Sequence, residues 1–160
     1  SIMGLEAINE QTYLAFANHH LSKNHKEISA AAFAYLYHRF DGITWYVQYV
    51  LNMLYTSITD KPLLEEDDVK FAIDGILAQH RFAYQALIYQ LTAKQKQVLT
   101  AIALEGKPSS LMSQEFLQKY HLGASTVQGA VKTLLDRDFI TQDEGVYQLC
   151  DKFLKLSLRG

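Results

Sequence analysis

The sequence is poor in the residues on which covalent cross-linking and thiolate chemistry depend. Its 160 residues contain one cysteine and two prolines, and the formal net charge is only −2. The single thiol, Cys150, cannot form an internal disulfide, and no second thiol is present to complete a metal site. We therefore interpret Cys150 as a small apolar residue and expect the protein to reside in the reducing cytoplasm.

Long apolar runs and signal peptides are also absent. Lys, Arg, Asp or His interrupts each hydrophobic stretch before it is long enough to cross a bilayer, so we expect no membrane partner. Two phosphate-binding motifs are missing as well. Ala101 stands where a phosphate loop ending in Gly106-Lys107 would need its first glycine, and no G-x-G-x-x-G occurs.

Catalytic and metal-binding constellations are missing too. His19 and His20 are adjacent, so on a helix they point about 100° apart and cannot share one metal ion. The acidic run at residues 65–68 is better explained as the negatively charged start of a helix than as a magnesium site. No serine or cysteine lies in a nucleophile elbow. We expect no catalytic residue, no metal ligand and no cofactor within this chain.

The residues that are present favour a folded, mainly helical protein with two parts. The sequence is 49% hydrophobic and 12% aromatic, which is enough for a packed core. Residues 1–90 carry 6 Lys+Arg against 10 Asp+Glu, a net charge of −4, whereas residues 91–160 carry 9 against 7, a net charge of +2. We predict a helical bundle over residues 1–90 and a second domain over residues 91–160.

Helical spacing and capping residues predict four helices in the first part. The first covers residues 5–21, and the second follows Ser29, a plausible N-cap, as far as Phe40. The third runs from Trp45 to about residue 58 with Thr44 as its cap, and the fourth from the acidic run to about residue 90. The buried side of the first helix is expected to contain Ile8, Tyr13, Leu14, Phe16 and Ala17. The many aromatic side chains of residues 33–55 are expected to belong to the core.

Three helices and a hairpin are predicted for the second part. The first helix covers residues 93–105 and is stopped by the segment 106–110; the second is seeded by Ser113, and the third opens at Ala124. Residues 139–142 and 146–149 then flank Asp143-Glu144-Gly145, which is a hairpin signal. This order is that of a helix-turn-helix with a wing attached, so the predicted fold is a mainly α bundle followed by a winged helix-turn-helix.

The third of these helices is the candidate recognition helix. The residues expected to contact DNA or a protein partner are Ser125, Thr126, Gln128, Lys132 and Arg137. Asp143 and Glu144, however, place negative charge at the tip of the wing, where a DNA-binding wing carries cations. From these residues the winged helix is expected to bind protein about as readily as DNA.

Four segments together resemble one protein family. They are residues 40–52 (FDGITWYVQYVLN), residues 91–103 (LTAKQKQVLTAIA), residues 125–134 (STVQGAVKTL) and residues 147–154 (YQLCDKFL). In this order they resemble the helical lid and the winged helix that follow the nucleotide-binding core in the prokaryotic archaeal-type ATPases of the AAA+/STAND P-loop group. The resemblance covers essentially the whole chain.

The resemblance implies that the chain is the C-terminal module of a longer ATPase. ATP and Mg²⁺ would then be bound by an upstream core in cis, and Arg39, Gly42, Thr44 and Trp45 would form the lid turn that faces the nucleotide. The start at Ser1 rather than at a methionine agrees with this expectation. The alternative is a free-standing winged-helix transcription regulator whose helical part serves as an effector or dimerisation domain.

Overall fold

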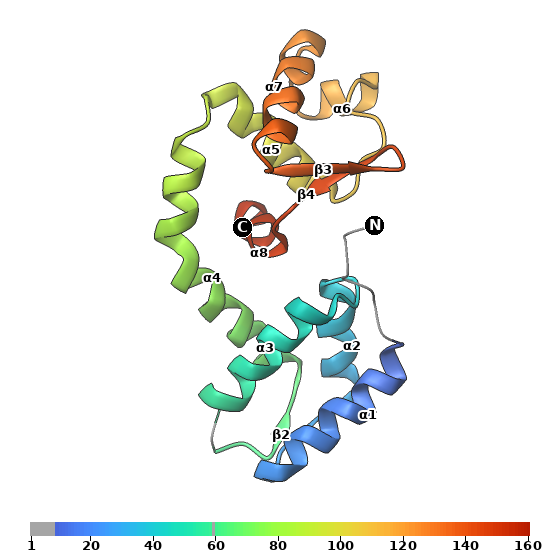
Figure 1. Ribbon diagram of the computed structural model, residues 1–160, viewed down its shortest axis with the longest axis vertical. Helices are drawn as coiled ribbons and strands as arrows, with labels where there is room; N and C mark the ends of the chain where they lie inside the picture. Colours follow the sequence, from blue (N-terminus) through green and yellow to red (C-terminus); the bar gives the residue numbers. More distant parts are fainter. Residues whose placement is uncertain (1–8, 59) are drawn as a thin grey trace. The chain divides into compact units, whose positions relative to one another are not determined.

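The computed structural model describes residues 9–58 and 60–160, which are mainly helical with a small β-hairpin near the C-terminus (Figure 1). This agrees with the predicted fold class. Contacts divide the chain into two compact units, one ending at Ala78 and the other beginning at Gln79. The division falls inside α4 (Glu66–Tyr89), whereas the boundary expected from the sequence, between residues 90 and 91, lies in the turn after this helix.

The first unit contains α1 (Glu10–Leu21), a 3-10 turn (Ser22–Asn24), α2 (Ala30–Arg39), α3 (Thr44–Ser57) and the first half of α4. Asn9 caps α1, because its side chain accepts hydrogen bonds from the backbone N–H groups of the first turn. The expected helical residues 5–8, with Ile8, lie outside the described residues. Phe16 was predicted to be buried, and this is wrong: its side chain is 59% exposed.

The turn between α2 and α3 differs from the expected one. Ser29 caps α2 as predicted, accepting from the Ala32 N–H at 3.1 Å. Thr44, however, is the first residue of α3 and not its cap; the cap position belongs to Ile43, which makes no side-chain capping bond. The cause is the tight turn before it. Gly42 has φ +66° and donates its N–H to the Tyr37 carbonyl at 2.7 Å, and this turn directs Ile43 into the core.

Two very short strands, which the sequence patterns do not predict, join the loops of this unit. β1 (Glu27–Ile28) pairs in parallel with β2 (Leu63–Leu64). The Asn18 side chain of α1 accepts from the Ile28 N–H at 2.8 Å and donates to the Ile28 carbonyl at 3.3 Å. A side-chain amide therefore satisfies the free edge of β1 and holds it against α1.

The core of the first unit is largely as expected. The aromatic side chains of Phe33, Phe40 and Tyr46 are buried, and Phe40 stacks on Tyr46 with a centroid separation of 5.4 Å. Trp45 is the exception, because it is 52% exposed. Trp45 directly precedes the buried Tyr46 in the first turn of α3, so its side chain points in a different direction around the helix. The expectation that Trp45 belongs to the core is wrong.

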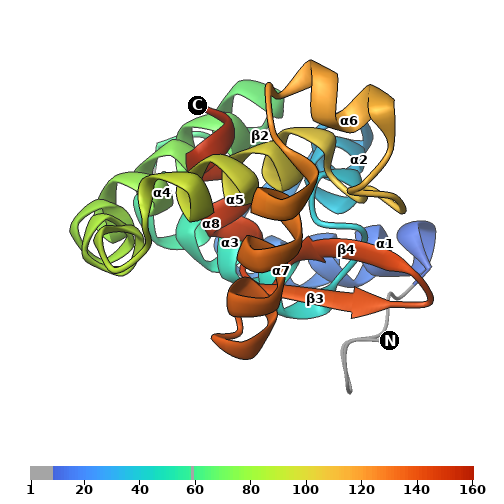
Figure 2. The same ribbon diagram turned by 90° about the horizontal axis from the view of Figure 1, so that it is seen from above.

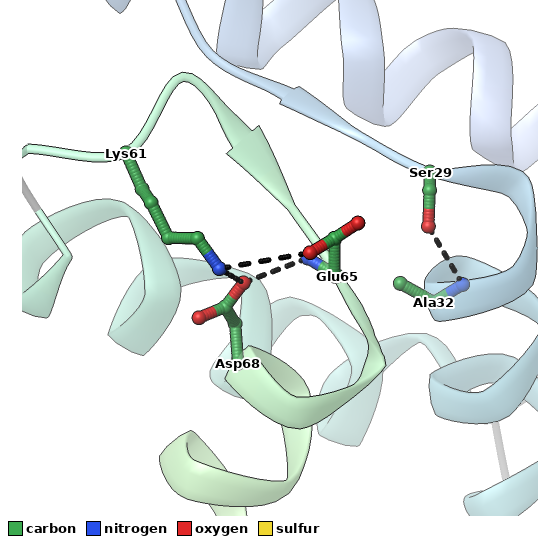
Figure 3. A network of polar contacts seen from close by, with 5 residues as sticks. All are labelled: Ser29, Ala32, Lys61, Glu65 and Asp68. Carbon is green, nitrogen blue, oxygen red and sulfur yellow. Dashed lines mark hydrogen bonds and ion pairs between the residues drawn. The ribbon is translucent and has the colours of Figure 1, made fainter.

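The acidic residues before and within the first turn of α4 stabilise the helix start, as the sequence indicates. The Asp68 carboxylate accepts from the Glu65 backbone N–H at 2.8 Å and from the Lys61 ammonium at 2.8 Å (Figure 3). Although burial raises the pKa of Asp68, the hydrogen bonds from Lys61 and Glu65 together hold it below its ordinary value. This contact ties the end of the loop to the helix.

The second unit contains the three predicted helices at almost the predicted bounds: α5 (Ala93–Glu105), α6 (Gln114–Lys119) and α7 (Ala124–Asp136). A capping box begins α5: Gln95 N–H donates to the Thr92 hydroxyl at 3.2 Å, and Thr92 N–H donates to the Gln95 side chain at 2.9 Å. Ser113 caps α6 as predicted.

The predicted hairpin follows α7, and both views show its two strands side by side (Figures 1 and 2). It consists of β3 (Ile140–Asp143) and β4 (Val146–Leu149), paired antiparallel. The turn is one residue shorter than expected, because Asp143 still pairs with Val146. Its two residues, Glu144 and Gly145, both have positive φ, as a tight two-residue hairpin turn requires.

A last helix, α8 (Lys152–Arg159), was not predicted. The Asp151 side chain caps it by accepting from the Phe153 and Leu154 N–H groups at 2.9 and 3.2 Å. The second unit packs around one core to which α5, α6, α7, α8 and the hairpin contribute. Its buried members include Val98, Leu99, Ile102, Phe116, Val127, Ala130, Leu134, Ile140, Leu149 and Leu154.

Candidate partner-binding face of the winged helix

The recognition helix α7 presents a narrow polar face to solvent. Its apolar side chains, Val127, Ala130 and Leu134, are buried in the core of the second unit. On the opposite side Ser125, Gln128 and Lys132 are exposed, at spacings of three and four residues. Such spacings place side chains on one face of a helix, so the structure brings these three predicted site residues into one line.

The other two predicted residues of this helix lie differently. Thr126 is half-buried near the start of α7, off the exposed line. Arg137 follows the last turn, where its guanidinium donates to the Gln90 carbonyl at 3.4 Å and to the Gln90 side chain at 2.6 Å. The same guanidinium lies 5.6 Å from the centre of the Phe139 ring. Arg137 thus holds the end of α7 to the chain that follows α4.

The wing beside α7 is acidic at its tip. Asp143 and Glu144 are exposed at the turn, and the sequence has no lysine or arginine between residues 138 and 151. Across the polar line of α7, Lys132 is the one cation, and it forms no ion pair with a residue that the structure describes. A phosphate backbone approaching the wing would therefore meet two carboxylates.

A groove of about 310 Å³ lies between α7, the wing and the connection from α5 to α6. Apolar side chains form much of it, and Met112 within it is 48% exposed. The Tyr147 N–H donates to the Pro108 carbonyl at 2.9 Å, which fixes the wing against this connection. The apolar lining consists of Leu111, Met112, Val127, Val131 and Tyr147, and its polar rim of Ser109, Ser110, Gln128 and Gln142.

Sequence patterns did not reveal this groove. Met112 and Tyr147 are far apart in the chain and belong to segments without helical spacing, so only the folded hairpin brings them together. Pro108 was the one usable signal in the sequence. Because a proline cannot continue α5, the connection lies outside this helix, and the Pro108 carbonyl accepts a hydrogen bond from β4.

A further cation close to this face is already engaged. Lys119 at the end of α6 donates to Glu105 at 2.6 Å, and the Tyr120 hydroxyl donates to the same carboxylate at 2.6 Å. The hydrogen bond from Lys119 is the main reason why the pKa of Glu105 lies below its ordinary value, and the reciprocal bond raises the pKa of Lys119. Lys119 is therefore held by a protein carboxylate.

The four residues expected at the lid turn lie on or directly beside the connection from α2 to α3 in the first unit. Arg39 ends α2, with its guanidinium 5.9 Å from the centre of the Tyr35 ring. Gly42 forms the tight turn, Thr44 begins α3, and the exposed Trp45 packs edge-on against Tyr46 with a centroid separation of 4.9 Å. The turn thus displays a cation and a large aromatic ring.

Metal-binding clusters and membrane-spanning helices are both missing from the described residues. No group of three or more His, Cys, Asp or Glu side chains within residues 9–58 and 60–160 could hold a metal ion. No helix in the part of the chain that the structure describes is both long enough and apolar enough to span a membrane.

Comparison with known proteins identifies the second unit. A family model described as a probable winged helix domain matches residues 82–160. This range contains α5 to α8, the hairpin and the last part of α4, so the predicted winged helix is confirmed. Comparisons with curated proteins and with solved structures gave no match.

Proposed function

We propose that this chain is the lid and winged-helix module of a P-loop ATPase and that its winged helix binds a protein partner through the face formed by α7 and the wing. The observation that carries the choice of a protein partner is the combination of an apolar groove with an acidic wing tip. Lys132 is the one exposed cation on the polar line of α7, whereas Asp143 and Glu144 stand at the wing tip.

This combination suits a protein better than a nucleic acid. A DNA-binding wing gains affinity by neutralising phosphates and releasing their counterions, and two carboxylates do the opposite. An apolar groove, in contrast, gains affinity by removing partner side chains from water, and the half-exposed Met112 is a flexible side chain that adapts to them. The partner we expect presents apolar side chains flanked by Lys or Arg.

The free-standing transcription regulator remains the second candidate, and one observation favours it. Ser125, Gln128 and Lys132 lie in line on the exposed side of α7, where a recognition helix in the major groove would read base edges and contact phosphate. If the helix reads bases, Gln128→Ala changes sequence preference. If Lys132 contacts phosphate, Lys132→Ala weakens binding to all sequences and reduces the salt slope by about one unit.

The ATPase assignment rests on the four segments that resemble that family and on the α2–α3 turn. This turn presents Arg39, a cation suited to phosphate, and the exposed ring of Trp45, which could lie against a base. ATP and Mg²⁺ would be held by the upstream core, since the phosphate loop that cradles the β and γ phosphates is missing from this sequence. Closure of the lid on the nucleotide would move the winged helix and its partner.

The coding sequence upstream of Ser1 tests the ATPase assignment. The proposal expects an in-frame region that encodes a G-x-x-x-x-G-K-[ST] phosphate loop. A start codon immediately before Ser1, with no such region, would contradict the ATPase assignment and support the regulator instead.

Selection from a display library of random twelve-residue peptides tests the protein-binding face. We expect the full chain to enrich apolar peptides that contain Lys or Arg. Their affinity should fall in Met112→Asn and in the neutral wing variant Asp143→Asn/Glu144→Gln, but not in Leu104→Asn, which removes an exposed apolar side chain of α5 outside the groove. Enrichment that all three variants retain would place the binding site elsewhere.

A further inference from the structure

A second groove, of about 480 Å³, lies on the winged-helix unit between the last part of α4, the start of α5, and α8. Its floor is apolar, and at its edge Tyr89 is 83% exposed. The lining residues are Arg81, Tyr84, Gln85, Ile88, Tyr89, Lys96, Leu154, Ser157 and Leu158. None of these residues contributes to the groove beside α7.

Polar contacts on both sides hold the walls of this groove in place. The Tyr84 hydroxyl of α4 donates to the Asp151 carboxylate at 2.9 Å, and the same carboxylate caps α8. At the end of α4, Gln90 accepts two hydrogen bonds from Arg137. The groove is therefore formed before any ligand binds, because both walls are fixed to the core of the unit.

The charge of this groove is positive, in contrast to the wing. Arg81 and Lys96 line it, and among the described residues that line it none carries a carboxylate. The sequence from residue 79 to residue 104 and the sequence of α8 contain no Asp or Glu at all. The Lys96 ammonium lies 6.0 Å from the centre of the exposed Tyr89 ring, so charge and apolar surface adjoin.

From this arrangement we infer that the groove binds an acidic amphipathic peptide segment of a protein. Its apolar side chains would cover the partly exposed Ile88 and Leu158 and the exposed ring of Tyr89. Its Asp or Glu side chains would pair with Arg81 and Lys96. A nucleic acid fits less well, because a phosphate backbone drawn to the two cations would leave the hydrocarbon floor uncovered. The winged helix would thus carry two docking faces of opposite charge, each with its own partner chemistry.

The test uses the full chain and the same kind of random twelve-residue peptide library. The affinity of each enriched peptide is then compared between the native chain and the variants. We expect a second group of enriched peptides that combine Asp or Glu with Leu, Ile or Phe. In fluorescence anisotropy their affinity should fall by about five-fold or more in Arg81→Gln/Lys96→Gln, since two ion pairs are lost. The fall should be larger at low salt than at high salt.

The matched control is Lys23→Gln/Lys94→Gln, which removes the same charge from exposed positions outside both grooves. Tyr89→Ala tests the apolar part, and far-ultraviolet circular dichroism checks that each variant is folded. Failure to enrich acidic peptides would overturn the inference, and so would equal losses in the two double variants. A twenty-nucleotide single strand or duplex is added as a competitor. If it displaces the peptides from the native chain but not from Arg81→Gln/Lys96→Gln, the groove is assigned to nucleic acid instead.

Discussion

Reversing the charge of the wing should create DNA binding where the native protein has little. The variant Asp143→Lys/Glu144→Lys changes the wing tip from two carboxylates to two ammonium groups at exposed positions, and Lys132 supplies a third cation on α7. If each of the three contacts one phosphate, log K against log salt has a slope of about −2.7. Affinity would then fall about 40-fold between 50 and 200 mM salt. On the polar line of α7 Lys132 is the one cation, so the native chain should bind the duplex too weakly for a salt slope to be measured.

Fluorescence anisotropy with a labelled random-sequence duplex measures the slope of the reversed variant, and the native chain is the weakly binding reference. Lys132→Ala in the reversed background should reduce the slope by about 0.9, because one phosphate contact is lost. The charge-matched control is Glu65→Lys/Glu66→Lys, which makes the same change in net charge at exposed residues of the first unit. Equal slopes for the wing variant and this control would refute the idea that the acidic wing excludes DNA.

Three smaller predictions concern the folded state. Thr92→Ala should lower the free energy of unfolding of the second unit by about 1 kcal/mol, because the capping box is lost. Gly42→Ala should destabilise the first unit by about 1–2 kcal/mol, because φ is +66° and the new Cβ would lie 2.6 Å from the Tyr37 ring. Asp68→Asn should cost about 1 kcal/mol near pH 7 through its contact with Lys61. Since folding lowers the pKa of Asp68, this difference should shrink as the pH falls below the ordinary value of 3.8 and vanish once the folded carboxylate is protonated.

Urea unfolding followed by circular dichroism measures all three, and each has a matched control. Ser157→Ala removes an exposed hydroxyl of α8 that no capping bond uses, and Asp74→Asn removes an exposed carboxylate of α4. Gly75→Ala is the most informative control, because Gly75 is helical and nothing lies within 4 Å of the point that an alanine Cβ would occupy. It should stabilise the helix by up to about 1 kcal/mol. A loss of stability in Gly75→Ala comparable to that in Gly42→Ala would contradict the backbone argument.

Local signals explain why α5, α6 and α7 could be predicted closely. Ser113 and the segment 106–110 mark helix ends by their own chemistry, and the buried side of α7 repeats at helical spacing. The same reasoning failed for α8. Its eight residues follow the hairpin directly, and in the sequence its cap, Asp151, is indistinguishable from the end of the preceding strand. It also failed for β1 and β2, because two-residue strands have no alternation to detect.

From the sequence, the residues of a candidate site could be predicted only where they lie on one helix or strand. Helical spacing placed Ser125, Gln128 and Lys132 on one face, but it could not show that Arg137 is bonded to Gln90, a residue 47 positions earlier. Both grooves join segments distant in sequence, so neither leaves a periodic signal. The acidic wing tip could be predicted from Asp143 and Glu144, but the basic groove emerges only in the fold, because Arg81 of α4 and Lys96 of α5 line it together.

The affinity of the native full chain for a random-sequence duplex at 50 mM salt decides whether the α7 face binds protein or DNA. Non-specific DNA binders have dissociation constants of roughly 10⁻⁴ to 10⁻⁶ M even at physiological salt, and bind more tightly when salt is lower. A winged helix that faces protein should show no saturable anisotropy change up to about 100 μM protein under this condition. Micromolar binding that weakens steeply with salt, and is lost in Lys132→Ala, would assign the α7 face to DNA and exclude the proposed protein-binding role.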